Sequence, residues 1–216
     1  MCGRYDTTHL TWAQIYKQLS GFAPVKTAPL NLEPNADVRP TTSQIVARLD
    51  PDGWTLDRMR WGLVPFWRNG KPLKDTAKGA GDGFKLTTFN ARVETVATAS
   101  TFKPAFAKRR CLVPASAWYE WTGAEGHKTK HRFVRVDGQP VWFAGMWDHC
   151  TTPDAGDVTS FTILTGPCEG WLADYHDRAP VILDPADWGE WLDPSQSAGQ
   201  LMAAVRPERF AVSLAG

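Results

Sequence analysis

The sequence predicts an α+β fold in which a curved or barrel-like, mostly antiparallel β-sheet is surrounded by short helices. Segments with strand-like alternation recur along the chain, and the helical segments between them are scattered and mostly short. Strands and helices do not follow each other in the βαβ rhythm that is typical of a parallel sheet. A length of 216 residues, 43% hydrophobic content and the absence of an internal repeat favour a single domain over residues 1–216.

The first elements are a helix and a hairpin. The clearest helix is expected over residues 8–20, and Gly21 can end it. Its apolar residues recur at helical spacing, and they are Trp12, Ile15, Tyr16 and Leu19. Residues 45–49 and 54–56 read as strands on either side of a turn made of Asp, Pro and Gly, which predicts a hairpin.

The middle of the chain combines a polar loop with further strands. Residues 68–85 are polar and glycine-rich, and we expect an exposed loop there. A second hairpin is expected between residues 132–136 and 140–144, through an Asp-Gly-Gln turn. The remaining patterns fit strands at 110–114, 117–122 and 159–165, and short helices at 92–99, 169–175, 185–192 and 197–204.

The charge of the chain is nearly balanced but unevenly distributed. A formal net charge of +1 excludes a uniformly basic nucleic-acid binder. Residues 85–135 nevertheless carry ten Lys and Arg against three acids, whereas residues 148–193 carry ten acids against one Arg. This asymmetry indicates a positive face for an anionic partner, or simply two solvated faces of opposite sign. The eleven Trp residues either fill the core or form a stacking surface for bases.

The four cysteines, at positions 2, 111, 150 and 168, show no CxxC pair and no Cys/His ladder. We therefore expect no metal site and no cofactor. The chain starts without an apolar signal region, and no run reaches the roughly 18 apolar residues of a membrane span. These features predict a cytoplasmic protein with reduced thiols and no membrane association.

Cys2 is the first candidate for chemistry, because removal of Met1 would make it the N-terminal residue. An α-amine titrates near ~7.7–8.0 and a thiol near ~8.5, so a useful fraction of each is nucleophilic at neutral pH. The amine can act as the base for the side chain, as in N-terminal nucleophile enzymes. It can also condense with an aldehyde, after which the neighbouring thiol closes a five-membered thiazolidine ring.

Three further residues stand in settings that favour a function. Asn90 lies two residues before Arg92, Glu120 lies within an aromatic strand, and His176 precedes an acid, a base and a proline. Alternation turns Trp118 and Glu120 to one face of that strand, and a carboxyl group among aromatic rings tends to have a raised pKa. The alternatives are a helix cap for Asn90, an edge charge for Glu120 and a surface histidine for His176.

Taken in order, six motifs of this chain resemble the SOS response-associated peptidase (SRAP) family, the abasic-site processing proteins. The resemblance covers nearly the whole sequence. It is carried by Met1-Cys2-Gly3-Arg4-Tyr5, Trp61-Gly62-Leu63-Val64-Pro65-Phe66-Trp67, Asn90-Ala91-Arg92-Val93-Glu94-Thr95, Phe102-Lys103-Pro104, Trp118-Tyr119-Glu120-Trp121 and His176-Asp177-Arg178 followed by Pro180.

The resemblance implies that the protein binds single-stranded DNA and crosslinks to abasic sites. Cys2 would form a Schiff base with the C1′ aldehyde and close a thiazolidine, and the protein would remove its own Met1. Asn90 would bond near the sugar or the Cys2 backbone, and Glu120 would orient the α-amine and relay protons. His176 would serve as general acid and base for sugar ring opening and for crosslink reversal, which an ordinary pKa near ~6.5 suits.

The same resemblance implies a DNA-binding set and a cellular setting. Gly3 of the N-terminal motif belongs to the DNA-binding set, and Pro40 would wedge between bases at the lesion. The phosphates would be bound by Arg4, Arg92 and Arg178. The DNA channel would be lined by Trp61 and Trp67. The implied activities are those of a DNA–protein crosslinking lyase with autopeptidase activity in the SOS response. We expect a monomeric protein that associates with the nucleoid when it is bound to DNA.

The chain departs from the family pattern in three places. The loop before Pro40 carries Asp37 where an Asn is usual, and Arg39 is placed to compensate. Ser100 stands where some relatives carry Arg, and the 68–85 loop is longer than the bacterial norm. Two other functions remain alternatives at this point: a thiol peptidase in which Cys2 acts in trans, and a single-strand-binding module without covalent chemistry.

Overall fold

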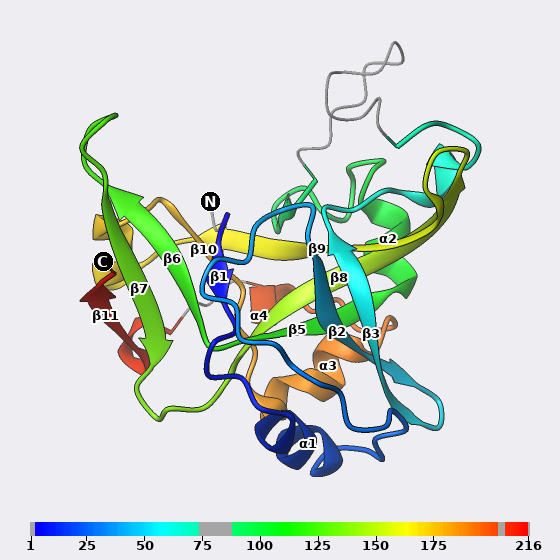
Figure 1. The fold of residues 1–216 in the computed structure, drawn as a ribbon, viewed down its shortest axis with the longest axis horizontal. Helices are drawn as coiled ribbons and strands as arrows, with labels where there is room; N and C mark the ends of the chain where they lie inside the picture. Colours follow the sequence, from blue (N-terminus) through cyan, green and yellow to red (C-terminus); the bar gives the residue numbers. More distant parts are fainter. Residues whose placement is uncertain (1–2, 74–87, 203–205, 216) are drawn as a thin grey trace.

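The computed structural model describes residues 3–73, 88–202 and 206–215. Five strands close into a barrel in the order β9-β3-β2-β5-β8, because β8 and β9 also pair with each other. All neighbours in the barrel are antiparallel except β3 and β9. The strands are β2 (Ser43–Asp50), β3 (Gly53–Trp61), β5 (Arg110–Ala115), β8 (Val141–Thr152) and β9 (Gly156–Pro167). Figure 1 shows the barrel on its right-hand side.

Two short strands extend the barrel along β9. β4 (Asn90–Arg92) pairs with it in parallel and β10 (Arg178–Pro180) pairs with it antiparallel. Both meet the last five residues of β9, since Arg92 and Pro180 each lie opposite Thr165. This pairing brings the Asn90 motif and the His176 motif, which are far apart in the sequence, to the same end of one strand.

A second, fully antiparallel sheet lies beside the barrel, in the order β1-β6-β7-β11. Its strands are β1 (Tyr5–Asp6), β6 (Ala117–Thr122), β7 (Thr129–Arg135) and β11 (Phe210–Leu214). β6 follows β5 after the single residue Ser116, whose backbone NH bonds the carbonyl oxygen of Asp6 at 2.7 Å. The N-terminal residues are therefore held where the sheet meets the barrel (Figure 1).

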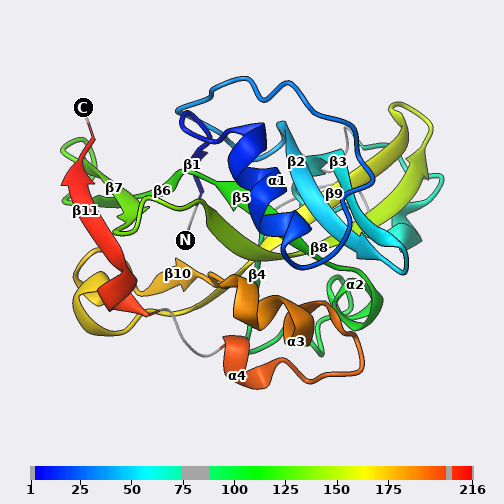
Figure 2. The ribbon, with the colours of Figure 1, turned by 90° about the horizontal axis from the view of Figure 1, so that it is seen from below.

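The helices are short and cover the barrel. α1 (Trp12–Ser20) and α3 (Trp188–Leu192) stand in front of it in Figure 2. Trp188 packs between Trp54 and Trp142, with ring centroids 5.6 and 5.2 Å away, and so joins α3 to the core. The other helical segments are α2 (Lys103–Lys108), α4 (Gly199–Met202), η1 (Phe66–Arg68), η3 (Gly170–Asp174), η4 (Pro185–Asp187) and η5 (Pro207–Arg209).

These observations confirm the predicted fold class, the first hairpin and the strands at 110–114, 117–122 and 159–165. The first helix begins at Trp12 rather than at residue 8, because Thr11 caps it through a reciprocal capping box with Gln14. Arg92 ends strand β4 and residues 93–98 form turns, so the helix predicted at 92–99 was wrong. The predicted loop at 68–85 lies largely outside the described residues.

The second predicted hairpin was also wrong. β7 pairs with β6 and β11, whereas β8 pairs with β5 and β9, so the two strands belong to different sheets. Both edges of β7 are already occupied by these neighbours. Arg135 bonds the Asp137 carboxylate at 2.9 Å, and Gly138 has a φ of 68°, so the connection turns the chain from one sheet into the next. A turn sequence signals a reversal, but the partners of the flanking strands depend on distant segments.

Candidate functional site

The N-terminal strand is fixed on both of its edges. On one side Tyr5 lies opposite Trp118 of β6, and the backbone NH of Tyr119 donates to the carbonyl oxygen of Arg4 at 3.1 Å. On the other side the backbones of Tyr5 and Val38 exchange hydrogen bonds of 2.9 and 3.3 Å. Extending the β1–β6 register by two residues brings Gly3 opposite Glu120. Cys2 immediately precedes Gly3 in the sequence and lies outside the described residues.

A buried carboxylate anchors this strand. Asp6 is 2% exposed, and it accepts hydrogen bonds from the backbone NH of Thr8 at 2.6 Å, from Arg132 Nε at 2.9 Å and from the Tyr119 hydroxyl at 3.1 Å. Burial opposes ionisation, but the hydrogen bonds from Thr8 and Arg132 outweigh it and hold the pKa of Asp6 below its usual value. The ionised Asp6 thus ties β1 to β6 and β7.

Glu120 is the titratable group nearest to that register position. Its side chain is 4% exposed, on the same face of β6 as Trp118, as the alternation predicts. Burial, together with the negative charge of Asp177, raises its pKa from 4.5 to about 7. A carboxyl group with this pKa exchanges a proton readily at neutral pH, so it can act as either acid or base.

His176 lies between η3 and β10, and its Nδ1 atom faces two partners. The backbone NH of Arg178 donates to Nδ1 at 2.9 Å, and an Asp177 carboxylate oxygen lies 2.6 Å from the same atom. The first contact suits the neutral ring and the second suits the protonated ring, so each charge state has a partner. Burial and the charge of Arg178 lower the pKa of His176, while Asp177 opposes this shift. The neutral ring, with its proton on Nε2, is favoured at neutral pH.

The segment around Glu120 on β6 lies close to the segment around His176, since the charge of Asp177 acts on Glu120. The charges of Glu120 and Asp177 both act on Cys168, and burial together with these charges raises the pKa of its thiol to about 11. The backbone NH of Cys168 bonds the Asp177 carbonyl oxygen at 3.0 Å. On β7, His131 lies opposite Glu120, and its ring contacts Tyr175 with centroids 4.8 Å apart.

Asn90 is linked to the N-terminal strand by the aromatic rings that pack beside it. It is 8% exposed, at the start of β4. The preceding Phe89 receives a hydrogen bond on its carbonyl oxygen from Trp61 Nε1 at 2.8 Å, and the two rings meet edge to face. The Trp61 ring in turn packs against Tyr5 of β1, with centroids 5.0 Å apart. Trp61 thereby links the Asn90 strand to the N-terminal strand.

The predicted phosphate-binding arginines occupy different environments. Arg92 is exposed at the end of β4. Arg178 is 9% exposed, and its guanidinium forms a two-pronged pair with Glu94 at 2.8 and 2.9 Å and bonds the Thr165 carbonyl oxygen at 2.5 Å. Arg178 therefore fastens the turn after β4 to β9, and its donors point at protein groups.

The two predicted channel tryptophans also differ. The Trp61 ring is fully buried, so it has no open face for a DNA base. Trp67 is 38% exposed in η1, next to Phe66 at 46%. η1 is held against β8, where the Phe66 backbone NH donates to Asp148 at 3.0 Å, on the opposite side of Figure 1 from β6. Of the pair, only Trp67 offers a ring surface to a ligand.

The loop before β2 brings Pro40 beside the N-terminal strand. Pro40 is half-buried, and the next residue, Thr41, adopts a φ of 76°. A β-branched residue is strained in that region. The Thr41 backbone NH donates to the Trp61 carbonyl oxygen at 2.7 Å, which holds the strained turn. Ser100, the other departure from the family pattern, is exposed in a turn.

Sequence reasoning predicted Arg4 but missed that two cations lie over aromatic rings on one face of β6. The guanidinium of Arg4 lies 5.3 Å from the Trp121 ring centre, and the Lys130 ammonium lies 3.9 Å from that of Tyr119. Alternation indicated that Tyr119 and Trp121 share a face, but Lys130 joins them only through the β6–β7 register. Asp6, Cys168 and Asp177 were missed for the same reason, since each depends on pairing between distant strands.

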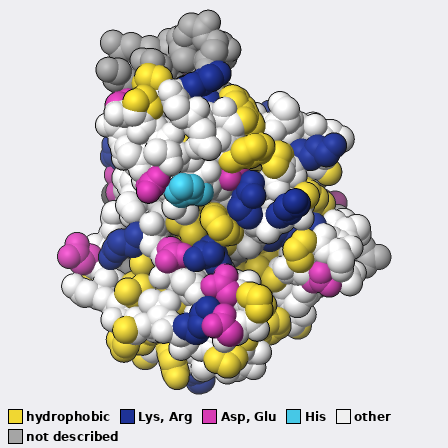
Figure 3. All heavy atoms as spheres, turned by 90° about the vertical axis from the view of Figure 1, so that its right-hand side faces the viewer, with side chains coloured by type: hydrophobic (Ala, Val, Ile, Leu, Met, Phe, Trp, Pro, Cys, Tyr) yellow, Lys and Arg dark blue, Asp and Glu magenta, His cyan; other side chains and the backbone are white. Residues whose placement is uncertain are grey.

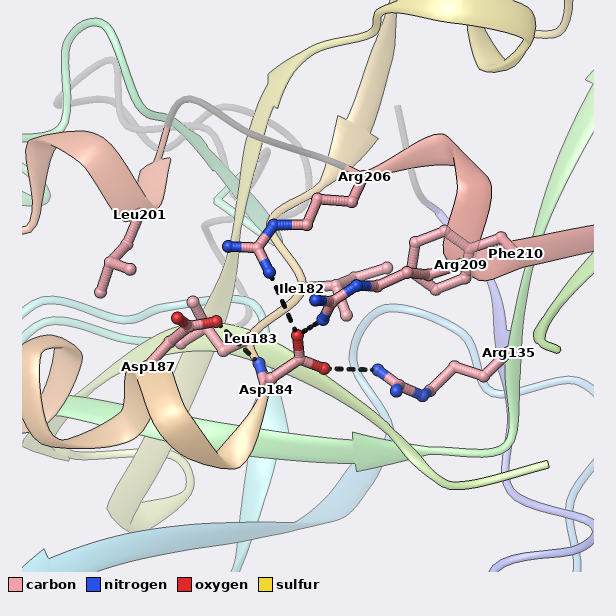
Figure 4. A pocket seen from close by; sticks show the side chains of 9 residues that line it. All are labelled: Arg135, Ile182, Leu183, Asp184, Asp187, Leu201, Arg206, Arg209 and Phe210. Carbon is pink, nitrogen blue, oxygen red and sulfur yellow. Dashed lines mark hydrogen bonds and ion pairs between the residues drawn. The ribbon is translucent and has the colours of Figure 1, made fainter. Parts of the chain in front are cut away.

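Two other hollows of the described surface hold charges that already pair with one another. In one of them Asp184 accepts from Arg135 at 2.7 Å and also contacts Arg206 and Arg209, which fastens η5 to the loop before η4 (Figure 4). A groove on the barrel is lined by Arg48, which bonds Asp57 at 2.8 Å. The face of the molecule that lies on the right in Figure 1 carries basic, acidic and apolar side chains interspersed with one another (Figure 3).

Within residues 3–73, 88–202 and 206–215, no group of three or more His, Cys, Asp or Glu side chains is arranged to hold a metal ion. The helices of this part of the chain are all too short or too polar to cross a membrane.

Comparisons with known proteins identify the family to which the chain belongs. The family model described as SOS response associated peptidase (SRAP) matches residues 1–213. The abasic site processing protein YedK of Escherichia coli is 32% identical over 197 residues, which cover 89% of this chain and 79% of YedK. The abasic site processing protein YMR114C of Saccharomyces cerevisiae is 34% identical over 181 residues, and the match spans 80% of this chain but only 44% of the yeast protein.

Solved structures share the fold. A crystal structure of a protein from Bordetella bronchiseptica superimposes with a TM-score of 0.80 at 27% identity, with all of both chains covered. Another from Bacteroides thetaiotaomicron reaches 0.77 at 22% identity, covering 97% of this chain and 91% of that one. From the match of the family model over nearly its whole length, the chain belongs to the SOS response associated peptidase (SRAP) family.

Proposed function

We propose that this protein processes abasic sites in single-stranded DNA by forming a covalent crosslink through Cys2. Hydrolysis of the Met1–Cys2 peptide bond first consumes one water and frees the α-amine. The amine then adds to the C1′ aldehyde of the open sugar, and loss of water gives a Schiff base. The Cys2 thiol adds to that carbon, its proton moves to the nitrogen, and a thiazolidine ring results. Crosslink formation thus releases one water.

One observation carries the proposal: the β1–β6 register leads the N-terminal residues to Glu120, a buried carboxyl group with a pKa of about 7. Cys2 is covalently joined to Gly3, so its Cα lies ~3.8 Å from that of Gly3. A nearby base with this pKa accepts a proton from the α-ammonium group, whose own pKa is near ~8. In its protonated form it donates to the hydroxyl group that leaves as water.

His176 and Asn90 complete the proposed catalytic set. With Nδ1 occupied by the Arg178 backbone NH, the neutral His176 ring presents a proton on Nε2. We assign that proton to opening of the sugar ring and to crosslink reversal. Asn90 offers a buried amide at the edge of the same region, and we assign it to hydrogen bonding with the sugar or with the Cys2 backbone.

The proposed path of the DNA rests on the exposed residues of the predicted set. Arg4 and Arg92 have accessible guanidinium groups for phosphates, and Pro40 stands at a strained turn beside β1. Arg178 and Trp61 are buried, and we assign them to holding β4 and β1 in place beneath this path. Relatives named as abasic site processing proteins support the choice of an abasic site as the lesion.

The test is a crosslinking assay with single-stranded DNA that bears one abasic site. We expect a heat-stable band for the wild-type protein and none for Cys2→Ala. Cys2→Ser keeps the amine but cannot form a thiazolidine, so its adduct should require borohydride reduction to survive heating. A stable adduct of Cys2→Ala would place the nucleophile elsewhere. Cleavage of unrelated peptides without any DNA adduct would favour a thiol peptidase acting in trans.

A further inference from the structure

An acidic side chain lies among cations beside the proposed path of the DNA. An oxygen of the Asp37 carboxylate lies 3.2 Å from an Arg4 guanidinium nitrogen, and the other oxygen bonds Arg39 at 2.5 and 2.7 Å. The side chains of Asp37 and Arg4 are a little over one third exposed, and that of Arg39 is 57% exposed. The bond with Arg39 and the charges of Arg4, Arg39 and Lys130 lower the pKa of Asp37, so the carboxylate is ionised at neutral pH.

These cations share one outward surface. Arg4 lies over the half-buried Trp121 ring, and Lys130 lies over the ring of Tyr119, which is itself buried on the same face of β6. The backbone bridge between Tyr5 and Val38 holds the Asp37 loop against β1, and Figure 1 shows this loop passing beside that strand. Arg4 and Arg39 therefore contact the Asp37 carboxylate directly next to the N-terminal segment, and Lys130 is close enough for its charge to act on that carboxylate.

We propose that Arg4, Arg39 and Lys130 form a phosphate-binding site for the DNA strand, and that the Asp37 carboxylate occupies this site as a stand-in for phosphate when DNA is absent. The inference rests on the proposed function and adds a competing internal anion to it. A phosphate group of the incoming strand takes over the guanidinium contacts, and Asp37 turns out to solvent. Breaking the two ion pairs offsets part of the binding free energy, so Asp37 weakens the affinity for any single strand.

The Asp37 side chain can be changed without loss of the loop. The loop is held by backbone hydrogen bonds between Val38 and Tyr5, and the Asp37 backbone NH bonds the side chain of Asn35 at 2.8 Å. Neither contact uses the Asp37 carboxylate. Asp37→Asn is therefore expected to fold normally, with a site that is open to phosphate.

The experiment measures binding of a short fluorescent oligothymidylate without an abasic site, by anisotropy across a salt series. Each exposed ion pair is worth about 0.2–1 kcal/mol, so removing both should tighten the Kd about two- to thirtyfold. The salt slope should stay close to that of the wild-type protein, because the same phosphate contact forms in both proteins once Asp37 is displaced. Asp52→Asn is the matched control, because Asp52 is an exposed carboxylate paired with Lys26 at 2.6 Å in the turn between β2 and β3. Its Kd should equal that of the wild-type protein.

A double variant tests whether the gain passes through Arg39. Asp37→Asn combined with Arg39→Gln should lose most of the gain in affinity. An Asp37→Asn variant that binds like Asp52→Asn, or more weakly than wild type, would overturn the proposal, as would a double variant that keeps the full gain. Crosslinking to abasic DNA is measured on the same preparations. A crosslink without an Asp37 effect refutes this inference alone, whereas no crosslink in any preparation refutes the proposed function.

Discussion

Replacing Glu120 with glutamine should change the pH dependence of stability in a predictable way. The side chain is 4% exposed, and its pKa rises from 4.5 to about 7 on folding, chiefly through burial. The folded protein therefore favours the protonated carboxyl, and it loses stability as the pH rises from about 4.5 to about 7. Glutamine has a similar shape but no ionisation, so the Glu120→Gln variant should not show this loss.

The size of the effect follows from the two pKa values. One pKa unit corresponds to about 1.36 kcal/mol, so ionising Glu120 destabilises the fold by about 1 kcal/mol at pH 5 and by about 3 kcal/mol at pH 8. The stability of Glu120→Gln relative to wild type should therefore increase by about 2 kcal/mol between these two pH values.

Urea denaturation of both proteins from pH 5 to pH 8 measures this difference directly. Glu125→Gln is the control, since it removes a carboxylate from the exposed turn between β6 and β7. Its stability relative to wild type should stay nearly constant across the range. A Glu120→Gln difference that is equally flat would refute the reasoning, because Glu120 would then ionise as it does in water.

Further predictions concern the anchor of β1 and the two arginines. Asp6→Asn should lose about 3 kcal/mol of stability in urea denaturation, because it breaks a buried ion pair with Arg132. The same variant should slow crosslinking more than it weakens DNA binding. Unchanged stability would contradict the anchoring role of Asp6. Arg92→Ala should leave Tm unchanged and reduce the salt slope of single-strand binding by about 0.7, and an unaltered slope would remove Arg92 from the DNA path. Arg178→Ala should lower Tm through loss of its pair with Glu94, worth roughly 1.5–3 kcal/mol, and a wild-type Tm would argue against its structural role.

The parts of the fold that sequence predicted well depend on local signals. The hairpin of β2 and β3 has a turn of Asp, Pro and Gly between two alternating segments, and nothing distant competes for that pairing. Residues 132–144 carry an equally good local signal, but the strands on either side pair with β6, β11, β5 and β9 instead. Which edge a strand joins is decided by the packing of the whole core, and a single turn does not contain that information.

The candidate site likewise has features that local sequence predicts and features that depend on contacts between distant segments. The raised pKa of Glu120 could be anticipated from its place in an aromatic strand, because burial of a carboxyl is the dominant cause. The internal pairing of Arg178 could not, since Glu94 meets it only after β4 and β10 both join β9. The burial of Trp61 likewise depends on packing against Tyr5 and Phe161. A motif therefore points to candidate residues, but it does not tell whether each side chain is exposed to a ligand or buried in support of its neighbours.

The most direct test of the central claim is the intact mass of the protein before and after incubation with single-stranded DNA containing one abasic site. Before incubation the mass should equal that of the chain without Met1. Afterwards a new species should have the summed mass of this protein and the DNA, less one water, and digestion should place the DNA on the peptide that begins with Cys2. A protein that retains Met1 and still forms the adduct, or an adduct on any other peptide, would contradict the account.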